Sequence, residues 1–289
     1  MRLGGVHALA GLADDAPTRD LRQTCIDVLC AYLRLPYTAE TDLPPDDTAA
    51  RQTYQALREV RHTVIRVIRD HLRLPPEHPH SWHGHDFDLT HVTFDGGDLS
   101  RARFSNGTVS SRMARFVGGT VDLRGTRFSG GAVDFRRAHF TDGRADFRET
   151  RISGGWVDFS GAQFSGGAVD FHRARFTDGR ADFSGAHFSD SPVIFNLSEF
   201  SGGRIELRGA RFAGGRVSFH GVRFSGSRAD FREVEFAGGM VDFAGAEFTG
   251  GTANFAGAVG STPTGLVPSN GSSVPDTLRP PSTWLPTGS

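Results

Sequence analysis

The 289-residue chain contains no lysine, so all 32 of its basic side chains are arginines. This composition is typical of a GC-rich bacterial genome rather than of one function. The formal net charge is −1. A balance so close to zero argues against a chain that binds nucleic acid through phosphate contacts, and equally against an acidic mimic of nucleic acid. We therefore expect nucleic acid to be an unlikely partner.

Cysteines and long apolar runs are also scarce. The only cysteines, Cys25 and Cys30, lie five residues apart and do not share a helix face, so we expect reduced thiols. No signal peptide opens the chain, and no run of ~18 apolar residues could span a bilayer. These absences predict a soluble, cytoplasmic protein with no membrane span. The first predicted helix begins directly after Met1 with no capping residue before it. A further segment upstream of Met1 therefore remains an alternative.

Motifs for catalysis are missing as well. The sequence shows no nucleophile–base–orienter set, no phosphate-binding loop that leads into a helix, and no Cys/His metal spacing. We therefore predict no catalytic residue, no cofactor and no metal. One alternative stays open, because imidazoles can bind a transition metal and four histidines lie close together. They are His78, His80, His83 and His85.

What the sequence does contain is a short repeat that carries all 24 phenylalanines, from Phe87 to Phe255. Its large apolar residues are separated alternately by five and seven positions, so the period is twelve. Val-Asp-Phe occurs at 133–135, 157–159, 169–171 and 241–243. A fixed short period of this kind indicates a solenoid, in which each repeat buries its apolar face against its neighbours.

The residue types within each repeat predict strands and tight corners. Val133 and Phe135 are two apart and point to the same side of an extended strand, while Asp134 between them is expected to face water. Pairs such as Gly130-Gly131 supply the positive φ angles that sharp corners need. Glycine at this density would cost a helix roughly 1 kcal/mol per residue, so the repeat is predicted to be β-structure.

The small–polar–large–x–x unit resembles the pentapeptide-repeat family. Leu89, Phe94, Leu99 and Phe104 follow it most closely, since they are spaced five apart. The resemblance implies a mainly β fold, a right-handed quadrilateral β-helix with four pentapeptides per coil. Later units differ from the family pattern, because every second pentapeptide gains two residues. Four corners would then make a 24-residue coil, four positions longer than the four pentapeptides of the family.

This register predicts which side chains stack along the solenoid. The expected structural stack is Phe135, Phe159, Phe183, Leu207, Phe231 and Phe255. A flat coil of twelve residues is the competing geometry. It would leave little room for two phenylalanines per layer at normal packing density, but the sequence leaves both coils open.

The chain is expected to divide into three parts. Residues 1–80 form an α-helical region that caps the solenoid, residues 81–258 form the β-helix, and residues 259–289 form a disordered tail rich in Pro, Ser, Thr and Gly. The tail is predicted to be dispensable for folding. A long helix is expected near 47–73, and its arginine-rich face is predicted to be solvated. Those arginines are Arg58, Arg61, Arg66, Arg69 and Arg73.

Outward positions provide the candidate interaction surface. In the 24-residue register three arginines lie beside Asp182, Glu206 and Asp230, either as a self-neutralising ladder or as a mixed-charge surface for a protein. Trp156 points outward in the same column, and one irregular coil exposes further apolar groups. The candidate residues are Trp156, Arg180, Pro192, Ile194, Leu197, Arg204 and Arg228.

Together these features predict a non-enzymatic scaffold that binds an unknown protein partner. The family resemblance also implies an alternative, because some pentapeptide-repeat proteins mimic B-form DNA and act on DNA gyrase. That role needs an acidic surface, whereas residues 86–257 contain 21 acidic side chains and 21 arginines. A metal or enzymatic site at the histidine-rich junction is a further alternative. Family members also dimerise through the C-terminal coil, so we expect an end-to-end homodimer here.

Overall fold

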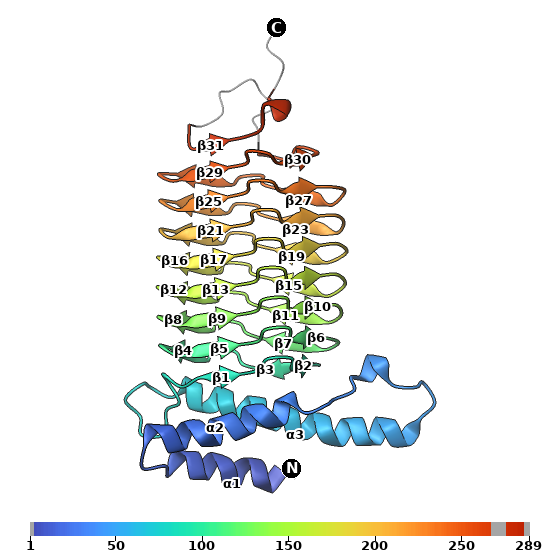
Figure 1. Ribbon diagram of the computed structural model, residues 1–289, viewed down its shortest axis with the longest axis vertical. Coiled ribbons are helices and arrows are strands. Elements are labelled where there is room, and N and C mark those ends of the chain that lie inside the picture. The colour runs from blue at the N-terminus through green and yellow to red at the C-terminus, as the bar shows by residue number, and fades with distance from the viewer. Residues whose placement is uncertain (1–2, 267–275, 286–289) are drawn as a thin grey trace.

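The structure, a computed structural model, describes residues 3–266 and 276–285. Three helices lie at one end of a long parallel β-solenoid with four sides (Figure 1). The predicted quadrilateral β-helix with a small helical N-terminal region is therefore confirmed. No helix in these residues is long and apolar enough to cross a membrane.

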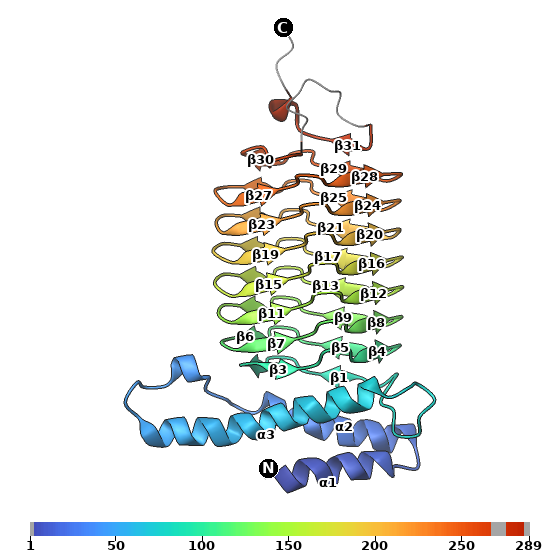
Figure 2. The same cartoon turned by 180° about the vertical axis from the view of Figure 1, so that it is seen from behind.

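The helices are α1 (Leu3–Asp14), α2 (Arg19–Arg34) and α3 (Thr48–Arg73), with a short 3-10 turn, η1 (Glu40–Asp42). The Thr18 side chain caps α2 by accepting a hydrogen bond from the Leu21 N–H, and Asp47 caps α3 through the Ala50 N–H. Helices α2 and α3 contact the first coil, whereas α1 packs on the far side of both (Figures 1 and 2).

Each wall of the solenoid is one parallel sheet. Sheet A contains β1 (Phe87–Asp88), β5 (Thr108–Ser110), β9 (Ala132–Asp134), β13 (Trp156–Asp158), β17 (Arg180–Asp182), β21 (Arg204–Glu206), β25 (Arg228–Asp230), β29 (Thr252–Asn254) and β31 (Leu278–Arg279). Sheet B contains β2 (Thr93–Phe94), β6 (Arg115–Phe116), β10 (His139–Phe140), β14 (Gln163–Phe164), β18 (His187–Phe188), β22 (Arg211–Phe212), β26 (Glu235–Phe236) and β30 (Val259–Gly260).

The other two walls have one strand per coil in the same way. Sheet C contains β3 (Gly97–Asp98), β7 (Thr120–Asp122), β11 (Arg144–Asp146), β15 (Ala168–Asp170), β19 (Pro192–Ile194), β23 (Arg216–Ser218) and β27 (Met240–Asp242). Sheet D contains β4 (Arg103–Ser105), β8 (Arg127–Ser129), β12 (Arg151–Ser153), β16 (Arg175–Thr177), β20 (Glu199–Ser201), β24 (Arg223–Ser225) and β28 (Glu247–Thr249).

Strand pairing fixes the length of a coil. Trp156 pairs with Arg180, and Arg180 pairs with Arg204, so the 24-residue coil is confirmed and the twelve-residue coil is wrong. The first coil is shorter, since Phe87 pairs with Val109, two positions sooner than the 24-residue register requires. It lacks the two residues that later coils add between their second and third corners.

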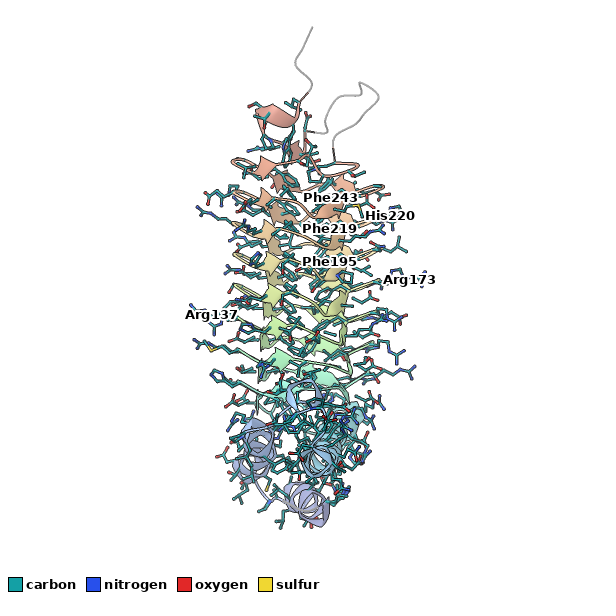
Figure 3. All side chains as sticks on the ribbon, turned by 90° about the vertical axis from the view of Figure 1, so that its right-hand side faces the viewer. Arg137, Arg173, Phe195, Phe219, His220 and Phe243 are labelled. Carbon is teal, nitrogen blue, oxygen red and sulfur yellow. The ribbon has the colours of Figure 1, made fainter. Side chains whose placement is uncertain are left out.

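Phenylalanine rings fill the interior in columns. The rings of Phe135, Phe159 and Phe183 lie 4.7 and 4.9 Å apart between centroids and are nearly parallel. On another wall Phe195, Phe219 and Phe243 stack in the same way (Figure 3). These centroid distances match the ~4.8 Å spacing of paired strands, so each ring rests on the ring of the coil below.

The D–A corner shows why the repeat requires glycine pairs. A Cβ on Gly155 would lie 2.4 Å from the carbonyl oxygen of Gly131 in the coil below. A Cβ on Gly179 would meet Gly155 at the same distance. Because these contacts are with backbone atoms, the neighbour cannot move aside, and glycine occupies this position in six of the seven coils from residue 107 to residue 251, with Ser227 as the exception.

The tail differs from the predicted disorder within residues 259–266, where β30 pairs with β26, and within residues 276–285. Strand β31 pairs in parallel with β29, and the buried Trp284 lies in the short helix η2 (Ser282–Trp284). The Trp284 Nε1–H donates to the carbonyl oxygen of Gly260, and its ring contacts Phe236 and Phe255. The last coil would otherwise expose those two rings, which is the physical reason that this segment packs. Residues 267–275 and 286–289 lie outside the described residues.

Candidate interaction surfaces of the solenoid

The aspartates of the repeat are turn residues, and the prediction that they face water is wrong for the five that are buried, Asp146, Asp158, Asp170, Asp182 and Asp230. Asp158 and Asp182 are buried, with only 3% and 5% of their surface exposed. Each carboxylate accepts a hydrogen bond from the backbone N–H two residues later, at Ser160 and Ser184, both at 2.8 Å. This is an Asx turn, which holds the chain at the corner after the strand.

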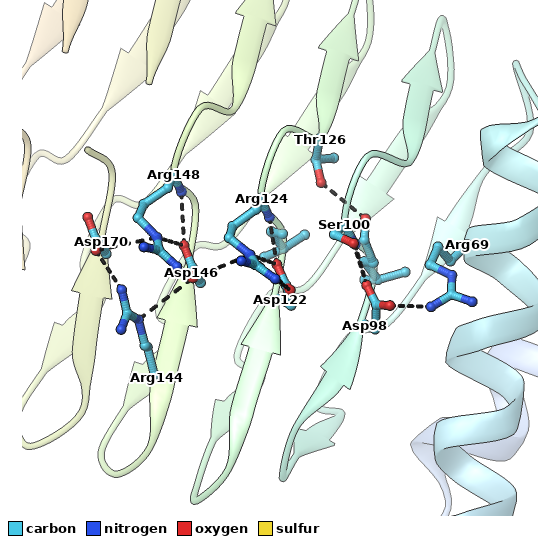
Figure 4. Close-up of polar contacts among 12 residues, drawn as sticks. Arg69, Asp98, Ser100, Asp122, Arg124, Thr126, Arg144, Asp146, Arg148 and Asp170 are labelled. Atoms are coloured by element: carbon cyan, nitrogen blue, oxygen red, sulfur yellow. Dashed lines mark hydrogen bonds and ion pairs between the residues drawn. The ribbon is translucent and has the colours of Figure 1, made fainter. Parts of the chain in front are cut away.

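Arginines lie over several of these carboxylates. Arg136 Nη2 contacts Asp134 Oδ2 at 2.5 Å, and Arg136 Nε lies 3.5 Å from Asp158 in the next coil. Sheet C repeats the arrangement, with Arg144 placed between Asp146 and Asp170 (Figure 4). The acidic columns are therefore screened by guanidinium groups rather than presented to a partner.

The pKa values of two carboxylates show the effect of this cover. Burial raises the pKa of Asp134, but hydrogen bonds and charge from Arg136 outweigh it and lower the pKa below its usual value. Asp158 has no arginine two residues later. Burial therefore raises its pKa despite the hydrogen bonds from Ser160, and the neighbouring carboxylates of Asp182 and Asp134 add to the rise.

Four of the seven candidate residues form one column on sheet A, in successive coils. They are Trp156, Arg180, Arg204 and Arg228. Arg180 bridges Asp182 and Glu206, and Arg204 contacts Glu206 at 3.2 Å. Trp156 is 38% exposed, and the guanidinium carbons of Arg136 and Arg180 lie 5.9 and 5.7 Å from its ring centroid. These cation–π contacts order the exposed indole, and the arginines next to it in the column are paired with acidic side chains.

The other three candidates lie elsewhere. Pro192 and Ile194 are on sheet C, the wall opposite sheet A, and the exposed Leu197 is at the corner between sheets C and D. Pro192 has no N–H, and β15 accordingly pairs with β19 through two residue pairs instead of three. The seven residues therefore do not form one surface.

Leu197 lines an open groove of about 580 Å³ along the C–D corner. Gly221 and Gly245 occupy its position in the next two coils, and their missing side chains hollow the groove. The ion pairs Arg175–Glu199 and Arg223–Glu247, at 3.7 and 3.2 Å, line it. Sequence reasoning singled out Leu197 but missed the groove, which becomes visible only when equivalent positions of successive coils are aligned.

Sheet D also carries a column of arginines that sequence reasoning missed. They are the first residues of four successive strands and pair directly with one another: Arg103, Arg127, Arg151 and Arg175. We call these four residues the arginine ladder. Its sequence signal is Arg-x-Ser/Thr repeated once in each 24-residue coil, as at 127–129 and 151–153.

The histidine-rich segment does not assemble a metal site. His83 Nε2 lies 3.2 Å from the Leu72 carbonyl oxygen, His85 Nδ1 lies 3.1 Å from Gln23 Oε1, and His80 pairs with Asp14. Burial, together with Arg19 and Arg22, lowers the pKa of His85 to about 4. In the part of the chain that the structure describes, no three His, Cys, Asp or Glu side chains gather as metal ligands.

Part of the arginine face of α3 contacts the solenoid, so the prediction of a solvated face is wrong for the buried Arg61 and the half-buried Arg69. The buried Arg61 donates to the carbonyl oxygens of Leu33 and Thr93, at 2.8 and 2.7 Å. Arg69 pairs with Asp98 (Figure 4), and Arg73 donates to Ser100. These contacts fix the helix to the first coil.

A buried carboxylate, Asp95, joins the helices to the solenoid and was also missed. It accepts hydrogen bonds from the hydroxyls of Tyr37 and Tyr54 at 2.5 and 2.9 Å, and lies 3.2 Å from His62 and 3.3 Å from Arg58. Burial raises its pKa, but the hydrogen bonds from His62, Tyr37 and Tyr54 outweigh this and lower the pKa to about 2. Its partners come from distant segments, so this network locks the cap in place.

The comparisons with known proteins agree with this architecture. The family model described as pentapeptide repeats (nine copies) matches residues 89–139 and 117–162, which cover the first three coils. No curated protein and no solved structure matches the chain. The same strand register continues beyond the matched residues to β29. The family-model match over residues 89–162 and the four-sided coil are consistent with a pentapeptide-repeat protein.

Proposed function

We propose that this scaffold-type solenoid is a non-enzymatic protein that holds a partner protein on the outer face of sheet A. The observation that carries the proposal is Trp156, an exposed indole held between Arg136 and Arg180 on a flat wall. Tryptophan and arginine dominate the binding energy of many interfaces, especially where an anchor is already ordered.

The surroundings of Trp156 support the same role. The arginines above it are paired with Asp182 and Glu206, so a partner would meet few unsatisfied charges there. Stacked phenylalanines behind the wall leave little freedom for it to bend. A rigid wall loses little conformational entropy on binding, which favours recognition of a rigid partner surface.

The rival role as a DNA mimic has less support. Mimicry needs exposed acidic groups in a regular array, whereas the aspartate columns are buried in Asx turns and several carry an arginine cover. Pro192, Ile194 and Leu197 stay a separate predicted surface, because they lie away from sheet A. The end-to-end homodimer would require the tail segment around Trp284 to leave Phe255, so we expect it only when that segment is removed.

The test compares two exposed apolar residues on opposite walls. Trp156→Ala removes the proposed anchor, while Met240→Ala removes an exposed side chain from the first position of β27 on sheet C. Each variant is used to capture proteins from the native host, and the captured proteins are quantified. We expect at least one protein to fall about tenfold with Trp156→Ala and to be unchanged with Met240→Ala. Equal capture by both variants would contradict the proposal.

A further inference from the structure

The arginine ladder is a run of four arginines, stacked in successive coils, with little acidic cover. Many other arginines of the solenoid pair with acidic side chains, as in Arg211–Glu235 and Arg208–Glu233. Among the described residues, no carboxylate lies within 4.0 Å of the side-chain nitrogens of Arg103, Arg127 or Arg151, and Arg175 reaches only Glu199 at the end of the ladder. Like charges on adjacent strands repel each other, so this column favours an anionic ligand.

The rest of the face is suited to the same ligand. Each ladder strand places a hydroxyl two residues after its arginine, on the same outer side: Ser105, Ser129, Ser153 and Thr177. Ser105 contacts His83 of the cap segment, whereas Ser153 is exposed. Guanidinium and hydroxyl groups together present hydrogen-bond donors along a straight, flat strip, and guanidinium groups recognise carboxylates by paired hydrogen bonds.

The spacing along the strip fits an extended peptide. Four arginines in successive coils span ~14 Å at ~4.8 Å per coil, and alternate residues of an extended chain repeat every ~6.6 Å, so three carboxylates span ~13 Å. Long arginine side chains can absorb the remaining mismatch. The groove overlaps the ladder at Arg151 and Arg175, and it gives such a peptide a path along the C–D corner.

Single-stranded nucleic acid fits this strip less well. Binding without sequence preference relies on aromatic side chains on which bases stack. The outward positions of sheet D within the ladder are occupied by arginine, serine and threonine, and none is aromatic. The strip therefore offers charge without a stacking platform.

We infer that the arginine ladder binds an acidic peptide segment of a partner protein, extended along the axis of the solenoid with acidic residues at alternate positions. This inference rests on the proposed scaffold role but concerns a different wall. Sheet A would then bind a folded surface, and sheet D would bind an acidic tail or linker.

The experiment measures binding of a fluorescein-labelled peptide of four Glu-Ser repeats by anisotropy at low ionic strength. Arg127→Gln with Arg151→Gln removes the centre of the ladder. Arg216→Gln with Arg228→Gln is the matched control, because it removes two exposed arginines from sheets C and A and changes the net charge equally. We expect affinity to fall about tenfold in the ladder variant and to stay within twofold of wild type in the control. Circular dichroism checks that both variants fold.

The outcomes separate the two proposals. Equal weakening by both double variants would show only general attraction to positive charge and would overturn the inference, as would no binding by the wild-type protein. A mixed-sequence single-stranded DNA 12-mer that binds more tightly than the peptide would overturn it in favour of nucleic acid. Trp156→Ala should leave peptide binding unchanged, so failure on sheet D does not affect the test on sheet A.

Discussion

The two ends of the solenoid are closed in very different ways. At the N-terminal end α2 and α3 lie across the first coil, Trp82 is fully buried, and Asp95 binds four side chains of the cap and its linker. At the C-terminal end a two-residue strand and Trp284 cover the last coil. Both covers hide the apolar rings and unpaired backbone that an open coil would expose. The comparison shows that a few residues are enough to cover an end of the solenoid. Holding the helices in one position on the first coil also requires the buried hydrogen bonds of Asp95, which we call the polar lock.

Replacing the tryptophan at each end should show the largest contrast. Trp82→Ala should cost about 3–5 kcal/mol, because the ring stacks on His71 at 4.1 Å and its loss leaves a cavity inside the cap. Trp284→Ala should cost about 1–2 kcal/mol, since a short covering segment can detach instead of enclosing a void. Urea unfolding measures both. Equal losses would show that the two covers are equivalent.

The polar lock should contribute next most. Asp95→Asn should lower stability by about 2–3 kcal/mol, because two tyrosine hydroxyls, His62 and Arg58 lose their charged acceptor. Asp88→Asn is the control at the same end, an exposed carboxylate paired with Arg34, and should cost under ~1 kcal/mol.

The same carboxylate predicts a pH dependence. The folded pKa of Asp95, about 2, is below the unfolded value. Its stabilisation is therefore complete above about pH 4 and is lost as the pH falls towards 2, a total of about 2 kcal/mol. Acid unfolding of wild type and Asp95→Asn should converge at low pH. Parallel curves throughout would contradict this assignment.

Removing the tail should have a smaller effect on stability but should change assembly. A chain that ends at Leu266 loses the buried Leu278 and Trp284, and we expect a cost of about 1–3 kcal/mol after the entropy of the released segment is counted. The exposed rings of Phe236 and Phe255 should then promote end-to-end pairing. Light scattering at high micromolar concentration should show a monomer for the full chain and a dimer for the shortened one. A dimeric full chain would show that the tail does not close this end.

The smallest expected change in stability comes from replacing Asp158, whose turn in the middle of the solenoid can be compared with the turn at Asn254 in the last coil. Asn254 makes the same turn in the last coil that Asp158 makes in the middle, through the Ala256 N–H. Asp158→Asn should therefore be neutral or stabilising by about 0.5 kcal/mol, because it keeps the acceptor and removes repulsion from Asp134 and Asp182. Asp158→Ala should cost about 1 kcal/mol. Thermal unfolding that ranks the two variants equally would disprove a role for the side-chain acceptor.

Much of the fold could be predicted from the sequence because the interior is strictly periodic. The alternating five and seven spacing determines which rings stack, and the closer spacing of Leu89, Phe94 and Leu99 marks the shorter first coil. The burial of Asp158 could not be predicted from alternation alone. Its carboxylate turns back to the backbone of the same corner, so an outward position is not a solvated one.

The candidate sites were less predictable for two reasons. The Asp95 network brings together Tyr37, Tyr54 and a loop of the first coil, and no local pattern encodes contacts across such distances. The packing of Trp284 on Phe255 is a long-range contact of the same kind. The arginine ladder, in contrast, was present in the sequence as a 24-residue recurrence. Each of its members looks like an ordinary surface arginine when taken alone, and the column becomes apparent only when strands of successive coils are paired.

The repeated coil sets fixed distances along the axis of the solenoid. Each 24-residue unit adds ~4.8 Å and places the next residue of every outward column on the same wall. Deleting or duplicating a whole unit would move Trp156 closer to the cap or farther from it without turning it to another wall. A change of two residues at a corner can be absorbed, as the 22-residue first coil shows, whereas removing one whole side of a coil would turn everything beyond it to another wall. The number of coils therefore measures the distance between whatever is held at the helical end and whatever is held along the walls.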